Sequence, residues 1–174
     1  MHAEESAAGA DLRAKLIGRG LSADSLPPAI PVPIPENYLF SGDFTESGVP
    51  GLGQYALFKL GADQVQLEAE LVALGVLPGG SGALYCLDLA TGQVILVDVA
   101  QKSVTGVNST FKAFCAFLNA YDHFLSANPT PQGLAANARE IGDWMRRIDP
   151  AAFDHELSEQ LWWPVVLDGL EASP

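Results

Sequence analysis

The chain has 174 residues, with 21 Asp and Glu against 9 Lys and Arg, and its formal net charge is −12. This length favours one domain with one core, and 48% hydrophobic against 17% charged residues is the composition of an ordinary globular protein. The acidic balance argues against binding to nucleic acid or to an anionic membrane, because both need a basic surface, and it fits a basic protein partner. Solubility alone is the other explanation of the acidity.

The first part of the chain predicts a tail, a helix and an extended strap. Residues 1–8 lack an apolar run, which predicts a disordered tail and argues against a secretory signal. Residues 10–19 place Leu12 and Leu16 on one face of a helix. Residues 26–35 contain five prolines, which exclude a helix or a central strand. The alternating aliphatic residues there favour a structural strap over a polyproline ligand for another domain.

Short apolar stretches predict the sheet, and in one of them apolar and polar residues alternate. Strands are expected over residues 55–60, 65–74, 83–89, 94–99 and 102–107. In the second of these Gln66, Glu68 and Glu70 form one wet face, with a helix as the competing prediction. The third and fourth surround a turn with Gly92 and are apolar on both faces, which predicts a central hairpin covered on both sides.

The C-terminal third predicts helices. Asn108, Ser109 and Thr110 offer side chains that cap a helix, and apolar residues then recur every three or four positions from Phe111 to Leu125. A second stripe runs over residues 134–148, and Asp149 before Pro150 is expected to cap a further segment. Pro164 is expected to break or kink the last helix. The predicted fold is therefore α+β: residues 9–174 form a single domain, a twisted, mainly antiparallel sheet of about five strands with an N-terminal helix and C-terminal helices.

Motifs for chemistry are missing from the sequence. The three histidines form no metal-ligand pattern, and the glycine-rich residues 79–82 lack the lysine and the spacing of a phosphate loop. Cys86 and Cys115 fit buried, reduced thiols of a cytoplasmic protein. Asp88 and Asp98 lie near strand ends, where carboxylates accept turn hydrogen bonds. We therefore predict no enzyme, no catalytic residue, no cofactor and no metal.

Residues for contact with a partner are found among the acids and the tryptophans. Trp162 and Trp163 are adjacent and cannot both point inward from one regular helix, so one of them is the aromatic candidate, and we assign Trp162 to the site. One acidic group is expected on the open strand face and the loops around it: Asp43, Glu46, Asp63, Glu68 and Glu70. Residues 148–174 form a second acidic block, with a charge of −6 and no Lys or Arg. Acidic surfaces of this kind raise the association rate with a basic partner and increase the specificity of binding.

The central hairpin also resembles a known family. From Gly82 the sequence reads G-x-L-x-x-L-D-L-x-T-G-x-V, Val97–Asp98 follow, and V-N-S-T-F begins at Val107. This order is similar to the SUKH superfamily over residues 71–121, and most similar to its group 4 immunity proteins of bacterial polymorphic-toxin systems. In residues 77–81 the chain departs from the many relatives that carry acids there.

The resemblance implies a non-catalytic, cytoplasmic immunity protein. Its partner would be a cognate toxin with a basic surface, a nuclease or a nucleic-acid deaminase, whose active site it occludes. A SUKH-type regulatory interaction domain with no toxin partner is the alternative, because a fold does not fix a function. An enzyme or small-ligand binder, the third possibility, requires a closed pocket with convergent polar groups. The sequence assigns no oligomeric state.

Overall fold

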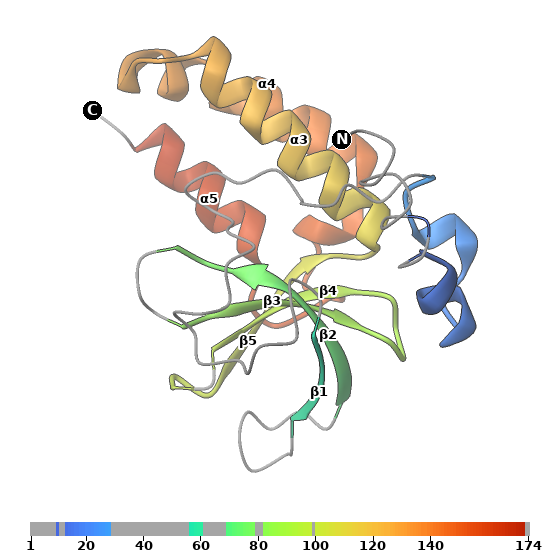
Figure 1. Ribbon diagram of the computed structural model, residues 1–174. Coiled ribbons are helices and arrows are strands. Elements are labelled where there is room, and N and C mark those ends of the chain that lie inside the picture. The colour runs from blue at the N-terminus through green and yellow to red at the C-terminus, as the bar shows by residue number, and fades with distance from the viewer. Residues whose placement is uncertain are drawn as a thin grey trace.

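A five-stranded sheet with helices over one of its faces forms the body of the molecule (Figure 1). The structure is a computed structural model. It describes residues 10, 13–28, 56–60, 69–78, 82–98 and 100–172, and of residues 56–60 and 69–70 it describes the backbone alone. The strands are β1 (Ala56–Leu60), β2 (Ala69–Val76), β3 (Leu84–Asp88), β4 (Val94–Asp98) and β5 (Ser103–Asn108).

The sheet is an antiparallel meander. Its spatial order β1-β2-β3-β4-β5 is the order of the strands in the sequence, and every neighbouring pair is antiparallel. The α+β class and the predicted hairpin are confirmed, with Gly92 at a φ of 77° in the turn between β3 and β4. Residues 69–76 form a strand, so the competing helix is wrong there, while residues 61–68 lie outside the described part.

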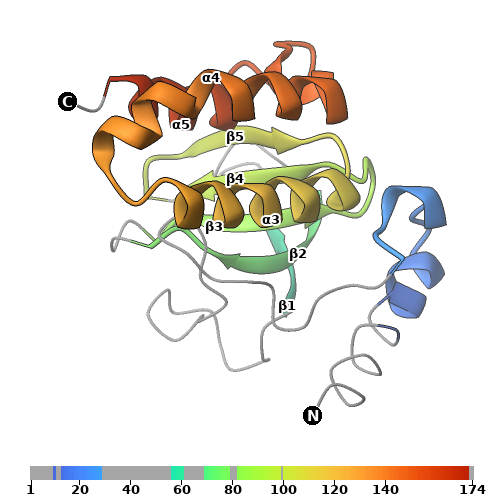
Figure 2. The same cartoon turned by 90° about the horizontal axis from the view of Figure 1, so that it is seen from above.

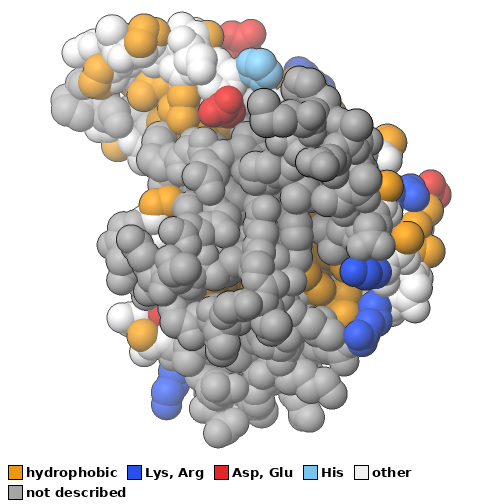
Figure 3. All heavy atoms as spheres, viewed as in Figure 1, with side chains coloured by type: hydrophobic (Ala, Val, Ile, Leu, Met, Phe, Trp, Pro, Cys, Tyr) orange, Lys and Arg blue, Asp and Glu red, His pale blue; other side chains and the backbone are white. Residues whose placement is uncertain are grey.

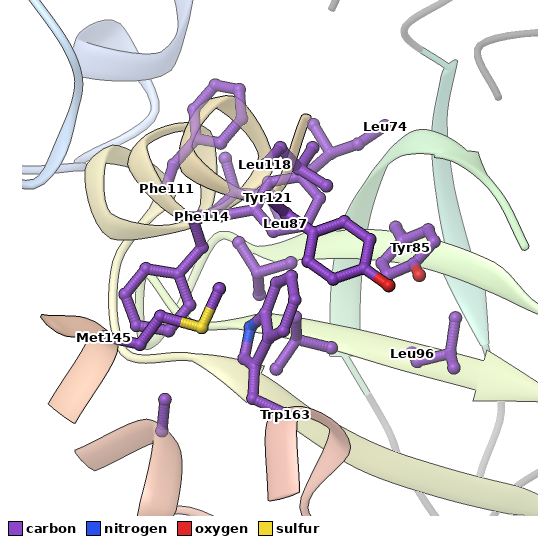
Figure 4. Close-up of a cluster of buried hydrophobic side chains, with 14 of the residues drawn as sticks. Leu74, Tyr85, Leu87, Leu96, Phe111, Phe114, Leu118, Tyr121, Met145 and Trp163 are labelled. Carbon is purple, nitrogen blue, oxygen red and sulfur yellow. The ribbon is translucent and has the colours of Figure 1, made fainter. Parts of the chain in front are cut away.

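The central strands are buried on both faces, as the sequence predicts. On the helical side Tyr85, Leu87 and Leu96 belong to the main hydrophobic cluster (Figure 4). On the other side Leu84, Cys86 and Ile95 belong to a second buried cluster. Two apolar faces on one strand require a central position in the sheet, and β3 has that position.

Three helices and one 3-10 turn complete the C-terminal part: α3 (Phe111–Ala127), α4 (Pro131–Ile148), η3 (Pro150–Phe153) and α5 (Trp162–Glu171). Seen from above, α3 lies over the sheet along the direction of β3 and β4, and α4 and α5 lie side by side next to β5 (Figure 2). Thr110 and Thr130 cap α3 and α4, since each side chain accepts a hydrogen bond from the backbone N–H three residues later. Pro164 lies in the first turn of α5 and does not interrupt the helix, because the N–H groups of a first turn have no helical acceptor.

The N-terminal helix is present at residues 13–18, and η1 (Ala23–Ser25) follows it. Leu16, Leu21 and Leu26 reach the main cluster, and Arg13 Nε donates to the carbonyl of Pro27 at 3.2 Å. The rest of the predicted strap and the predicted tail lie outside the described residues. None of the described helices has the length and apolar character to cross a membrane.

Candidate partner-binding surface

A buried polar cluster joins the sheet to the C-terminal helices. It consists of Asn108, Ser109, Asp149 and Trp163, and we call it the Asp149 cluster. Asp149 Oδ2 accepts from Asn108 Nδ2 at 3.0 Å and from the Ser109 N–H at 2.9 Å, while Oδ1 accepts from Ser109 Oγ at 2.7 Å. The indole N–H of Trp163 donates to Asn108 Oδ1 at 2.9 Å. Asn108 and Asp149 are buried, so these bonds replace the water that both polar groups lose.

The Asp149 cluster corrects two sequence predictions. Asn108 and Ser109 do not cap α3, because that cap is Thr110. Asp149 precedes η3, as predicted, but its side chain makes no capping bond there. Its carboxylate instead takes three donors from the end of β5 and the residue after it, which satisfies a buried charge more fully than a cap bond does.

A groove opens beside this cluster, where β5, the end of α4, η3 and the start of α5 meet. Its volume is about 610 Å³, and we call it the C-terminal groove. The lining residues are Thr105, Arg146, Phe153, His155, Gln160, Leu161, Trp162, Pro164 and Val165. Val165 is 62% exposed, which is unusual for a large aliphatic side chain. The groove thus offers apolar surface to a partner.

The wall of the C-terminal groove is tied to the sheet at Gly106. The Gly106 N–H donates to the carbonyl of Gln160 at 2.7 Å, and Gly106 forms a parallel bridge with Leu161. A Cβ at position 106 would lie 2.8 Å from Ser158 Cβ, so only glycine fits without displacing the loop before α5. The contacts of Gly106 with Gln160 and Leu161 fix the position of the backbone directly before Trp162, the first residue of α5.

Trp162 lies between the core and the groove. It is partly buried and packs against the main hydrophobic cluster, to which the fully buried Trp163 belongs, so both indoles contact the core and only Trp162 keeps part of its surface exposed. Burial raises the pKa of Tyr85, and the Trp162 side chain beside it acts in the opposite direction. The indole nitrogen of Trp162 is shielded from solvent. A ring held in this way can offer its remaining surface with little loss of side-chain entropy on binding.

Charges around the groove are uneven. The Arg146 guanidinium lies 4.7 Å from the centre of the Phe153 ring and 3.5 Å from Asp143, so its charge has partners within the chain. Three exposed acids, Asp154, Glu156 and Glu159, lie in the loop between η3 and α5, and we call them the acidic rim. On the face shown in Figure 3, acidic side chains lie over the helices at the top, and Lys and Arg side chains lie mainly lower.

Of the residues predicted for the partner site, the structure places Trp162 at the C-terminal groove. Asp43, Glu46, Asp63 and Glu68 lie outside the described residues, and Glu70 pairs with Lys59 across β1 and β2, without a described side chain. The structural role of the two strand-end acids is confirmed: Asp88 Oδ1 accepts from the Ala90 N–H at 2.8 Å, and Asp98 Oδ1 from the Gln101 N–H at 3.0 Å.

A second groove of about 540 Å³ separates α3 from α4 and includes Phe124, Ile141 and Trp144. Asn137 Nδ2 closes one end of it with a 2.7 Å hydrogen bond to Asn128 Oδ1. Among the described residues no group of three or more His, Cys, Asp or Glu is arranged to hold a metal ion. Cys86 and Cys115 are free thiols, the first buried and the second partly buried.

The described part of the chain thus combines an antiparallel meander, helices over one of its faces, a buried polar cluster and a groove with apolar lining residues. The family model of the SUKH-4 immunity proteins matches residues 45–169. That range covers more than half of the chain, so the chain belongs to the SUKH-4 immunity protein family, as the resemblance of the central hairpin indicates. Comparison with curated proteins and with solved structures gave no match.

Proposed function

We propose that this protein binds a cognate bacterial toxin and neutralises it by occluding the toxin's active site. The observation that carries the proposal is the family match over residues 45–169, since immunity to a toxin is what the family is named for. The C-terminal groove supports it, because partly exposed aromatic and aliphatic side chains beside one another are typical of the centre of a protein interface.

The proposed toxin is a nuclease or a nucleic-acid deaminase of a polymorphic-toxin system. Such an enzyme needs a basic groove for its substrate. A chain with a net charge of −12 competes for that groove, and its acidic surface accelerates the encounter. In this proposal the protein acts in the cytoplasm by binding alone, without catalysis, and contacts neither nucleic acid nor a membrane.

The acids predicted from the sequence stay part of the proposal. Asp43, Glu46, Asp63, Glu68 and Glu70 would add to the charge that meets the toxin, and Trp162 would provide the aromatic contact. A regulatory interaction domain with no toxin partner is the competing function, and the experiment below separates the two.

The test is co-expression with the toxin domain encoded beside this gene. We expect restored growth, and a one-to-one complex in a pull-down that weakens at high ionic strength, because salt screens exposed charges. A catalytically inactive toxin domain serves as the bait, so that binding is measured without toxicity. Absence of both the complex and the rescue would reject the immunity function for that pair and favour the regulatory domain.

A further inference from the structure

Among the residues that the structure describes, no further strand pairs with the outer edge of β5, which lies next to the C-terminal groove. β5 pairs with β4 along one side, and β5 is the last strand of the sheet. On its other side the described residues make one short contact, the bridge of Gly106 with Leu161. The contact is short because Ser158, two residues before Gln160, packs against Gly106 itself and does not continue along the edge of β5.

The open edge begins at Val104. The Gly106 N–H points away from β4, since its acceptor is the carbonyl of Gln160. The pairing of β4 with β5 is regular from Gly106 back to Ser103, and backbone groups in an antiparallel ladder alternate between the two sides of a strand. Val104 therefore also turns its N–H and C=O away from β4. Within the described part of the chain these two groups have no hydrogen-bond partner.

The outer edge of β5 and the C-terminal groove adjoin each other at Thr105. Thr105 follows Val104 in β5 and lines the C-terminal groove together with Leu161 and Trp162. An unpaired donor and acceptor are what an added β-strand requires, and a pocket beside them is what selects one of its side chains. This combination distinguishes the site from the groove between α3 and α4, which is lined by the two helices and Asn128 and includes no strand.

We propose that Val104 receives an extended segment of the toxin as an added strand. One side chain of that segment fills the C-terminal groove against Trp162, and a neighbouring Lys or Arg faces the acidic rim. This inference rests on the proposed function and names the surface and the chemistry of the partner. A basic segment fits because the rim carries three carboxylates, while the one arginine in the groove already stacks on Phe153.

The first test removes the outward donor. Val104→Pro deletes a single N–H, and proline is tolerated on an edge strand where that N–H faces outward. Val104→Ala is the matched control, because it loses the aliphatic side chain but keeps the N–H. With the inactive toxin domain in calorimetry, we expect Val104→Pro to raise Kd at least tenfold and Val104→Ala to change it less than threefold.

The second test measures the solvent protection of the Val104 amide in the wild-type protein and needs no variant. Exchange of the Val104 amide hydrogen, followed by NMR, should be fast in the free protein and at least a hundredfold slower in the complex. A third test reverses the rim charge: Glu159→Lys should weaken binding and reduce its salt dependence. Thermal melting of each variant checks that the fold is retained.

The outcomes separate this inference from the proposed function. Tight binding by the wild type, with an unprotected Val104 amide and an unchanged Kd for Val104→Pro, would overturn the added strand and leave the immunity function standing. If the wild type neither binds the toxin domain nor rescues growth, both the added strand and the immunity function are rejected for that toxin. Protection of the Val104 amide together with the loss of affinity establishes the strand addition.

Discussion

Asp149 lies 41 positions after Asn108 in the sequence, and its carboxylate accepts a 3.0 Å hydrogen bond from the Asn108 side chain. The same carboxylate oxygen also accepts the Ser109 N–H, and Asn108 in turn accepts the indole N–H of Trp163. One buried acid therefore holds together the end of β5, the start of η3 and the start of α5.

Removal of this acid should be costly. Asp149→Ala leaves the Asn108 amide and the Ser109 N–H buried without an acceptor, and we expect the free energy of unfolding to fall by about 2–4 kcal/mol. Urea denaturation measures it. Asp149→Asn is the control, because an amide can still accept from Asn108 and donate to Ser109 Oγ, and its loss should be less than half as large. Equal losses for both variants would mean that the acceptor role of Asp149 is unimportant.

Trp162 should matter for the partner more than for the fold. Trp162→Ala removes the aromatic side chain of the C-terminal groove, and we expect Kd for the inactive toxin domain to rise by about 10–100-fold. Trp144 is the matched control, since it is also a partly buried tryptophan beside a groove, but between α3 and α4. Trp144→Ala should change Kd less than threefold. A larger effect at Trp144 would place the partner on the helical groove instead.

Gly106 should tolerate no side chain. A methyl group there would meet Ser158 Cβ at 2.8 Å, so Gly106→Ala must displace the loop that carries the acidic rim. We expect a loss of about 1–3 kcal/mol in the free energy of unfolding. Gly169 in α5 is the control, because a Cβ there meets nothing within 4 Å, and Gly169→Ala should stabilise the helix by about 0.5–1 kcal/mol. Similar melting temperatures for both variants would contradict the close approach at Gly106.

Stability should decrease in alkaline solution. Burial raises the pKa of Cys115 from 9.0 to about 12, and burial raises the pKa of Cys86 in the same direction. Above pH 9.0 the unfolded chain loses these protons and the folded chain keeps them, so the free energy of unfolding falls as pH rises, by at most about 1.4 kcal/mol per pH unit for each thiol.

Denaturation at a series of pH values measures that slope, and Cys115→Ala should make it shallower. A thiol reagent at pH 8 should label both cysteines quickly in urea and slowly in the folded protein. Fast labelling of the folded protein would show that the thiols are accessible.

The sheet was predictable because its information is local. Two apolar runs, in β3 and β4, and the Gly92 turn between them determine the hairpin within a short stretch of chain. The Asp149 cluster was not predictable, because Asp149 before Pro150 and Asn108 before Ser109 both fit helix caps when each is considered alone. Their contact depends on how α4 returns the chain to the end of β5.

The candidate site was predictable only in part. Two adjacent tryptophans predict that one of them is less buried than the other, but only the structure shows that Trp162 is the partly exposed one. The rest of the C-terminal groove combines Thr105, Arg146 and Val165 from three elements, and no sequence pattern joins them. The exposure of Val165 and the need for glycine at position 106 are tertiary properties, although a glycine inside a strand is a signal of close approach.

The meander order of the sheet has a consequence for the order of folding. Each strand pairs with the next one along the chain, so the sheet closes through short loops, whereas the Asp149 cluster joins residues 41 and 55 positions apart. Closing long loops costs more entropy and slows folding, so we expect these contacts to form last. During synthesis on the ribosome, the C-terminal groove is then completed only after α5 has emerged, so a nascent chain forms its sheet before it forms this groove.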